Sequence, residues 1–193
     1  MRDLQIIIRT MPERREFAEY LRRHLPDAIF LWDEQPRTTL APARAVAQFL
    51  RAMTAAGDRP SLQMEDDVIL TQGFREKVQA AIEERPDSVI QFFSMRKDDL
   101  TVGSRWDRSF LGNLCAYYPP GYCPQIAAYR SLWPGKQIHT CGMDLMVRDW
   151  LKSRKERYWI HVPSLVDHRV AVSMIDRRRS SKRQSLTFRD PLS

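Results

Sequence analysis

The sequence lacks any long apolar run, and this absence argues against a helix that spans a membrane. No stretch of the 193 residues approaches the roughly 20 consecutive apolar residues that such a helix needs. Residues 1–15, MRDLQIIIRTMPERR, contain only a short apolar run, so they do not resemble a secretory signal peptide. We therefore expect a cytoplasmic location.

Cysteine is scarce as well. The chain has three cysteines, Cys115, Cys123 and Cys141, an odd number whose spacing matches no zinc or redox motif. We expect all three to be reduced. The sequence also has no internal repeat and no linker rich in Gly or Ser. A length of 193 residues with 43% apolar content is typical of one soluble globular domain.

Positive charge is present, but it is unevenly distributed. Residues 151–193 contain 11 of the chain's 31 Lys and Arg and 4 of its 24 Asp and Glu, so the whole net charge of +7 lies there and residues 1–150 are neutral. The charge is densest in DRRRSSKRQS, residues 176–185. Such a basic segment is either a solvated surface or a contact for a polyanion such as nucleic acid, nucleotide phosphates or acidic lipid.

Apolar periodicity predicts strands that alternate with helices through the first half of the chain. Strands are expected at 4–10, 28–32, 61–70 and 88–95, and helices at 12–25, 41–57 and 71–86. The second half is less regular, with a polar loop at 97–109, a strand at 114–118, a short helix from about 124, a helix at 142–154 and a strand at 157–165. This alternation indicates an α/β domain whose mixed, mostly parallel sheet is covered by helices on both faces.

Polar side chains stand where three of the expected strands end. Arg9 and Thr10 end the first strand, Asp33 follows the second, and Glu65–Asp67 interrupt the third. Ligands of open α/β sheets bind at the carboxyl ends of the strands, so these residues are expected to share one rim.

The triplet Glu65-Asp66-Asp67 is flanked by apolar residues on both sides. Carboxylate oxygens suit Mg²⁺ and Mn²⁺, which often take one or two protein carboxylates together with phosphate oxygens. Alternation along the strand predicts that Glu65 and Asp67 point to one side, where they could share a site, and that Asp66 points to the other. The alternative is that the triplet begins a surface turn.

Taken in order, these segments resemble the glycosyltransferases of the GT-A fold, a Rossmann-like single domain. The likeness is closest to those related to family 25 and to short glycosyltransferase-like proteins of bacteriophages. It rests on IIIRTMPERR as the opening strand and nucleotide-binding loop, SLQMEDDVIL with LTQGF leading into a helix, GMDLMVRDWL, and HVPSLVDHR. We expect the domain to cover residues 1–175 and a basic tail to cover 176–193. A phage-encoded protein would work in the cytoplasm of its bacterial host.

The resemblance implies transfer of a sugar from a nucleotide sugar, with a UDP-sugar expected, to a hydroxyl acceptor. It implies a divalent cation, Mn²⁺ or Mg²⁺, held by Glu65, Asp67 and His168. Arg9, Thr10, Arg14, Asp33 and Asp66 would contact the nucleotide sugar, and Asp144 would be the general base. A dedicated base favours inversion at the anomeric carbon. Asp99 and Asp107 are weaker candidates for the base. For each of these residues a purely structural role, such as solvated charge or an acid in a helix's first turn, stays open.

The basic end of the chain favours a polyanionic acceptor. We expect a hydroxymethylated pyrimidine base in phage DNA, with Arg177, Arg178, Arg179, Lys182 and Arg183 on the phosphate backbone. The base would have to leave the stack, and Tyr117, Tyr118, Tyr122 and Trp106 are candidates to stack on it or to fill the gap. Two alternatives stay open: a glycosyltransferase of surface polysaccharide or lipopolysaccharide, and a non-catalytic nucleic-acid-binding domain on a degenerate transferase fold.

Overall fold

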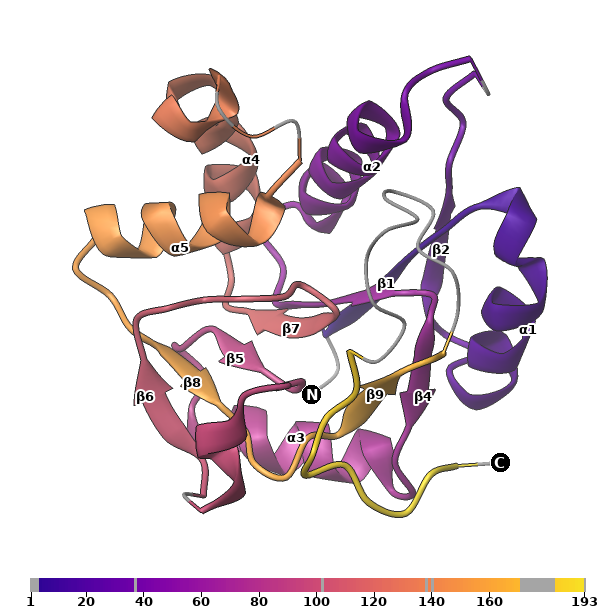
Figure 1. The fold of residues 1–193 in the computed structure, drawn as a ribbon, viewed down its shortest axis with the longest axis vertical. Helices are drawn as coiled ribbons and strands as arrows, with labels where there is room; N and C mark the ends of the chain where they lie inside the picture. The colour runs from indigo at the N-terminus through magenta and orange to yellow at the C-terminus, as the bar shows by residue number, and fades with distance from the viewer. Residues whose placement is uncertain are drawn as a thin grey trace.

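The computed structural model describes residues 4–36, 38–101, 103–137, 139, 141–170 and 183–192. Within these residues, seven strands form one central sheet in the order β2-β1-β3-β7-β5-β8-β6 (Figure 1). Their bounds are β1 Gln5–Thr10, β2 Ile29–Trp32, β3 Ser61–Glu65, β5 Ile90–Gln91, β6 Arg105–Asp107, β7 Cys115–Tyr118 and β8 Tyr158–Ile160.

The sheet is mixed, but most of its strands run in one direction. β1 is parallel to β2 and to β3, and β5 is parallel to β8. Only β7 and β6 run against the others, because β7 is antiparallel to both β3 and β5, and β6 is antiparallel to β8. The predicted mixed, mostly parallel sheet is therefore confirmed.

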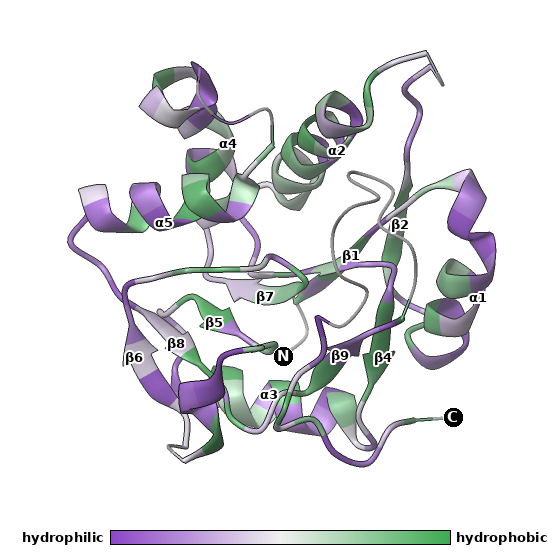
Figure 2. Ribbon diagram, viewed as in Figure 1, coloured by the Kyte–Doolittle hydropathy of each residue, from purple (hydrophilic) through white to green (hydrophobic). Residues whose placement is uncertain are grey.

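Helices cover both faces of the sheet, as the sequence predicts. Helices α1 (Arg15–His24) and α3 (Phe74–Glu84) pack on one face, and α2 (Ala41–Ala56), α4 (Tyr122–Leu132) and α5 (Met143–Ser153) on the other. Alternate side chains of β1 divide between the two cores, with Ile6 and Ile8 in the first and Ile7 in the second. In Figure 2, β2 and β4 are hydrophobic over much of their length, whereas the helices alternate in hydropathy.

The first helices begin and end where local sequence predicts. Pro12 starts a 3₁₀ turn at Pro12–Arg14, which leads directly into α1. Pro42 lies in the first turn of α2, and Gly57 follows its last residue with a φ of 55°, a conformation that other residues adopt at a cost. No helix in the described parts of the chain is long and apolar enough to cross a membrane.

The predicted third strand is wrong in one respect, because 61–70 divides into two strands. β3 ends at Glu65, the chain bends at Asp66 and Asp67, and β4 (Val68–Leu70) continues in a separate direction. β4 pairs with β9 (Val166–His168) in a second, two-stranded sheet. Pairing between segments so far apart in sequence leaves no local signal. The predicted fourth strand is also much shorter, covering only Ile90–Gln91.

Residues 183–192, which the sequence analysis assigns to a basic tail, pack against the domain. The Leu192 N–H donates to Leu70 O at 2.7 Å, and Tyr20 Oη donates to Leu192 O at 3.0 Å. Ser185 N–H donates to Asp167 Oδ1 at 2.7 Å. The described end of the chain thus covers the β4–β9 sheet, as the yellow trace in Figure 1 shows.

Candidate functional site

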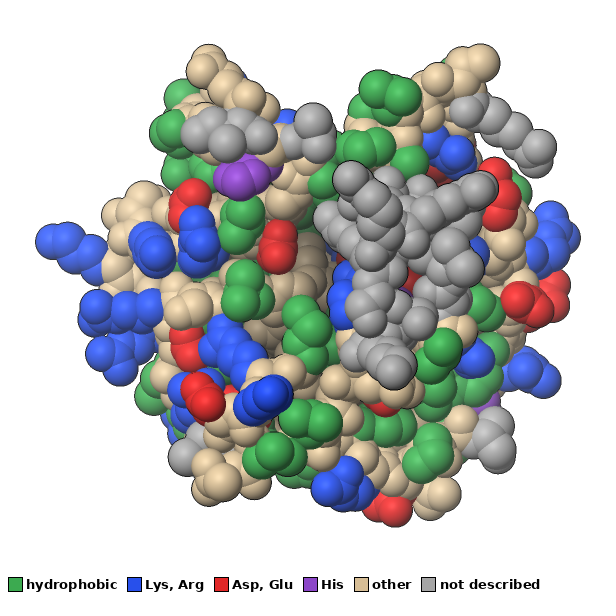
Figure 3. Space-filling view, in the orientation of Figure 1, with side chains coloured by type: hydrophobic (Ala, Val, Ile, Leu, Met, Phe, Trp, Pro, Cys, Tyr) green, Lys and Arg blue, Asp and Glu red, His purple; other side chains and the backbone are tan. Residues whose placement is uncertain are grey.

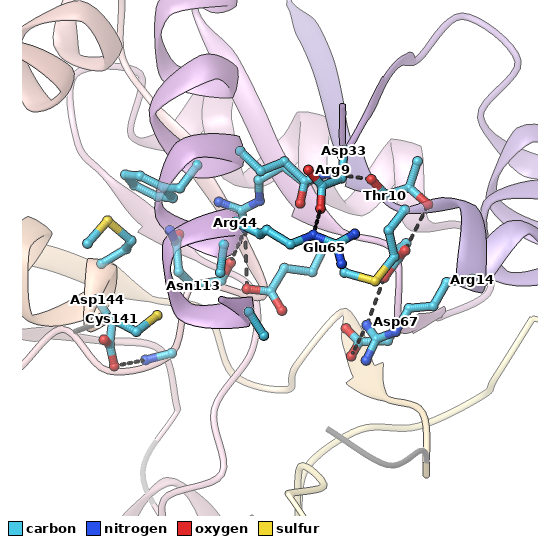
Figure 4. Close-up of a pocket in the computed structure, with 18 of the residues that line it drawn as sticks. Arg9, Thr10, Arg14, Asp33, Arg44, Glu65, Asp67, Asn113, Cys141 and Asp144 are labelled. Atoms are coloured by element: carbon cyan, nitrogen blue, oxygen red, sulfur yellow. Dashed lines mark hydrogen bonds and ion pairs between the residues drawn. The ribbon is translucent and has the colours of Figure 1, made fainter. Parts of the chain in front are cut away.

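A pocket of about 340 Å³ opens at the rim where β1, β2 and β3 end. The register explains its position, because Arg9 on β1 lies opposite both Leu31 on β2 and Glu65 on β3. The pocket is rich in charge of both signs (Figure 4). Its basic lining residues are Arg9, Arg14, Arg44 and Arg183, and its acidic ones are Asp33, Glu65, Asp66, Asp67 and Asp144.

Arg9 and Glu65 form part of this lining. Arg9 Nη2 donates to Asn113 O at 2.8 Å and lies 3.4 Å from Glu65 Oε1. The Arg9 side chain is almost fully buried, whereas that of Glu65 remains 43% exposed. Partial desolvation raises the pKa of Glu65, with Arg9 opposing the shift and Asp67 adding to it. Glu65 is therefore a carboxyl group whose proton affinity is increased by its surroundings.

Asp66 and Asp67 share one partner, Arg14. Arg14 Nη1 lies 2.9 Å from Asp66 Oδ1 and 2.7 Å from Asp67 Oδ2, and Thr10 Oγ1 donates to Asp66 Oδ2 at 2.8 Å. Both aspartates are 4% exposed. The expected separation of Asp66 from Asp67 by strand alternation is wrong, because the strand ends at Glu65 and the bend turns both carboxylates toward Arg14.

The ion pairs with Arg14 offset only part of the effect that burial has on the pKa of Asp66. Burial raises the pKa of Asp66, even though Arg14 opposes the shift. For Arg14, burial lowers the pKa but Asp67 and Asp66 together outweigh it, so the net shift is upward. Arg14 is thus held firmly in its charged form beside two acids.

His168, predicted as a metal ligand, lies against Asp67. His168 Nε2 is 3.4 Å from Asp67 Oδ2, and both side chains are buried. His168 Nδ1 is 2.7 Å from Arg169 O, and because a carbonyl oxygen only accepts, Nδ1 carries the proton. In the neutral ring Nε2 then presents a lone pair, which can accept from Arg183 Nη2 at 3.3 Å. The same lone pair faces a carboxylate oxygen, an arrangement that a cation between the two atoms would stabilise.

The described residues contain no group of three or more His, Cys, Asp or Glu side chains able to hold a metal ion. A smaller donor set does fit. Ligand atoms about 2 Å from a cation lie about 3 Å apart when they are at right angles, close to the separation of His168 Nε2 and Asp67 Oδ2. A backbone carbonyl that accepts from the other ring nitrogen is the usual support of a metal-binding histidine. Asp67 Oδ1 is buried and has no hydrogen-bond partner in the described structure.

Asp33 lies at the α2 side of the pocket. Its Oδ2 accepts from Arg44 Nε at 2.6 Å, and its Oδ1 accepts from the Gln35 N–H at 2.9 Å. Gln48 Nε2 donates hydrogen bonds to Thr10 O and Leu31 O, and these bonds hold α2 against the ends of β1 and β2. This corner holds a carboxylate in a fixed position.

Asp144 lines the opposite wall, in the first turn of α5. The Gly112 N–H donates to Asp144 Oδ2 at 3.3 Å. Gly142, directly before α5, has a φ of 109°, which only glycine adopts readily, and this turn brings the start of the helix to the pocket. Asp99 and Asp107 do not line the pocket; they pair with Arg105 and Arg96 instead.

Sequence reasoning missed several lining residues. Residues of α2 that line the pocket recur at a spacing of three and four, a signal of one helix face that could have been read: Ala41, Arg44, Ala45, Gln48 and Phe49. Asn113 had no such signal. It is 8% exposed, its Oδ1 accepts from Tyr118 Oη, and its Nδ2 has no partner among the residues described.

Other predicted residues lie elsewhere. Tyr117 and Tyr118 are buried on β7, so their side chains belong to the core. Trp106 and Tyr122 line a separate, open surface hollow. Arg177, Arg178, Arg179 and Lys182 lie outside the described residues. Arg183 lines the pocket, where the prediction had placed it on nucleic acid.

The chain's similarity to known proteins lies in its fold rather than in its sequence. No family model matches the chain, and no curated protein matches it. Among solved structures, the chain resembles a glycosyltransferase involved in the glycosylation of the major capsid of PBCV-1, with a TM-score of 0.52 and 13% identity over 82% of this chain and 83% of that one. It also matches A197 from STIV, with a TM-score of 0.49 and 14% identity over 86% of each chain. The chain has a glycosyltransferase-like fold.

Proposed function

We propose that the protein is a nucleotide-sugar-dependent glycosyltransferase. The proposal rests on one arrangement: Asp67, Arg14 and Arg183 line a pocket whose far wall presents Asp144, and the buried His168 side chain contacts Asp67 and Arg183. Two facing lone-pair donors suit a cation, and guanidinium groups suit the diphosphate that such a cation would neutralise. The fold supports the proposal without assigning a substrate.

The donor would lie along the ends of the strands. Arg14 and Arg183 are close enough to the acid cluster to contact the diphosphate, and Thr10 and Asp66 support that end of the pocket. Asp33 would accept from a nucleoside N–H or hydroxyl at the α2 corner, because Arg44 and Gln35 already fix its orientation. Arg9, tied to Asn113 O, would form the floor beneath the sugar.

A divalent cation, Mn²⁺ or Mg²⁺, would be held by Asp67 and His168, with Glu65 available on the same rim. When bound, it would neutralise charge that grows on the departing nucleoside diphosphate. The nitrogen ligand favours Mn²⁺ over Mg²⁺.

Asp144 is the proposed general base. The acceptor hydroxyl oxygen would form a bond to the anomeric carbon while the bond from that carbon to the diphosphate breaks, and Asp144 would take the hydroxyl proton. Asp144 lies in the first turn of α5 and lines the pocket, so its carboxylate is placed to reach an acceptor hydroxyl bound there. Attack by a separate, base-activated acceptor inverts the anomeric configuration.

For the acceptor, we propose a hydroxymethylated pyrimidine base in DNA. Support comes from the excess positive charge of residues 151–193. In the described structure, basic side chains gather where α5 ends and β8 begins, at the left edge of Figure 3: Lys152, Arg154, Lys155 and Arg157, all exposed. An 11-residue helix is about 16 Å long, so this patch stands roughly that far from Asp144, a span that a DNA backbone bridges easily.

The test is to incubate the protein with UDP-glucose, Mn²⁺ and DNA containing hydroxymethylcytosine or hydroxymethyluracil, and to measure sugar-modified nucleosides by mass spectrometry. Parallel reactions contain GDP-mannose as donor, unmodified DNA, or lipopolysaccharide as acceptor. Metal-dependent transfer to modified DNA that is lost in Asp67→Asn supports the proposal. Transfer only to lipopolysaccharide moves the acceptor to a surface glycan. DNA binding without hydrolysis or transfer of any nucleotide sugar would favour the non-catalytic alternative.

A further inference from the structure

Arg14 contacts both acids of the pair Asp66 and Asp67. A single nitrogen, Nη1, lies within 3 Å of both Asp66 Oδ1 and Asp67 Oδ2. The side chain is 13% exposed and lines the pocket, so it lies at the boundary between the buried acids and the space for a ligand.

The other proposed ligand also has an arginine beside it. Arg183 Nη2 contacts His168 Nε2 at 3.3 Å, and Arg183 lines the same pocket. Guanidinium groups therefore contact one oxygen of Asp67, Oδ2, and the Nε2 atom of His168, whereas Asp67 Oδ1 has no partner among the described residues. A cation can reach Asp67 Oδ2 fully only if Arg14 moves away.

An arginine that leaves the acids has a second partner within the pocket. Guanidinium binds phosphate oxygens through parallel hydrogen bonds, and its long side chain can swing while the backbone of the 3₁₀ turn stays in place. The centroid of the Phe17 ring lies 5.9 Å from the Arg14 Cζ atom, so the ring borders the guanidinium group. The exchange would thus leave neither the acids nor the arginine without an opposite charge.

We propose that Arg14 is an exchangeable counter-cation: it neutralises Asp66 and Asp67 in the free protein and passes to the diphosphate of the donor when a divalent cation takes its place. This inference rests on the proposed function. It makes the binding of the cation and of the diphosphate mutually dependent. The cation neutralises the acids that Arg14 leaves, and the diphosphate neutralises the Arg14 that the cation displaces. Coupling between two ligands is reciprocal and typically amounts to about 5- to 150-fold in affinity.

The test is to titrate Mn²⁺ into the full chain by isothermal calorimetry, with Mn²⁺ electron paramagnetic resonance as a second readout. Each titration is performed without nucleotide and with saturating UDP or GDP. In the wild-type chain, we expect weak Mn²⁺ binding that the correct nucleotide strengthens by about tenfold or more. In Arg14→Gln, Mn²⁺ should bind more tightly without nucleotide, and the strengthening by nucleotide should fall to a few-fold at most. Arg14→Lys keeps the charge and should behave more like the wild type.

Arg15→Gln is the matched control, since Arg15 is an exposed neighbour that lies over the Trp32 ring and away from the acids. It should leave both affinities and their coupling unchanged. If Arg14→Gln proves unstable, Mn²⁺ should raise its midpoint of thermal unfolding by more than that of the wild type, because the cation replaces the missing charge.

Coupling in Arg14→Gln equal to that of the wild type, or Mn²⁺ binding no tighter without nucleotide, overturns the exchange while leaving the proposed function intact. Absence of Mn²⁺ binding by the wild-type chain under all conditions contradicts the metal assignment itself, and the exchange with it.

Discussion

His168 Nε2 lies 3.4 Å from Asp67 Oδ2, although the two residues stand in different halves of the sequence. The contact exists because β4 and β9 pair, with Val68 opposite His168. Residues 183–192 cover this small sheet and bring Arg183 to the same histidine. The geometry of the proposed metal site therefore depends on a tertiary pairing outside the main sheet.

Replacement of His168 by Gln is expected to raise the Mn²⁺ concentration needed for half-maximal transfer by at least about tenfold, since one of two proposed ligands is lost. Asp67→Asn should have a larger effect because it also removes the negative charge. His161→Gln is the control, because the His161 ring lies beside Phe92 and its Nδ1 contacts Pro163 O, whereas His168 contacts Asp67. Unchanged metal dependence in His168→Gln would remove this residue from the site. Activity is measured as release of nucleoside diphosphate over a range of Mn²⁺ concentrations.

Asp144→Asn is expected to lower kcat by about 10²–10⁴-fold while leaving the affinity for nucleoside diphosphate unchanged, because the amide cannot take the acceptor proton. Asp107→Asn, which alters an ion pair with Arg96 away from the pocket, should retain the wild-type kcat. Steady-state kinetics and calorimetry together check this prediction. An equal loss of nucleotide affinity in Asp144→Asn would point to a binding role instead.

Ser164→Ala is expected to destabilise the protein by about 1–3 kcal/mol, because it leaves a buried donor without its acceptor. The Ser94 N–H donates to Ser164 Oγ at 2.9 Å, and Ser185 Oγ donates to the same oxygen at 2.8 Å. For a chain of this length, each kcal/mol corresponds to about 2–4 °C in Tm. Ser131→Ala, at an exposed hydroxyl within α4, should change Tm little. Similar Tm values for both variants would show that the hydrogen bonds to Ser164 Oγ contribute little to stability.

His161 is expected to make stability fall as the pH is lowered below about 6.5. Burial lowers its pKa, and the Pro163 carbonyl, which accepts from Nδ1, opposes the shift only in part. Between the ordinary pKa of histidine and the lower pKa of His161 in the folded protein, the unfolded chain binds more protons than the folded chain. Stability therefore increases with pH across that window.

The measurement is urea unfolding of the wild type and of His161→Gln at pH 7 and 5.5. The raised pKa values of Glu65, Asp66 and Asp167 act in the opposite direction, but they are common to both proteins and cancel in the comparison. The variant should lose less stability on acidification than the wild type. An equal or greater loss in the variant would assign the pH dependence to other groups.

The strand ends could be predicted from sequence because each strand carries its own local signal. Runs such as IIIRT and IFLWD place an apolar strand directly before a polar residue, and parallel strands bring such ends to one rim. Arg9, Asp33 and Glu65–Asp67 accordingly line one pocket.

The rest of the site depends on contacts that local sequence does not encode. Asp66 and Asp67 turn to the same side because β3 stops at Glu65 and β4 joins β9, a pairing with no local signature. Asn113 reaches the pocket from an irregular segment before β7, where periodicity is absent. Arg183 returns to the pocket because 183–192 hydrogen-bonds to β4 and Asp167 rather than extending as a tail.

The most direct test of this account is a crystal structure of the protein with Mn²⁺ and the nucleoside diphosphate that binds it. The account predicts Mn²⁺ in contact with Asp67 and His168, the diphosphate against Arg14, and the nucleoside toward Asp33. A diphosphate bound away from this pocket, or Mn²⁺ bound without contact to Asp67, would contradict it.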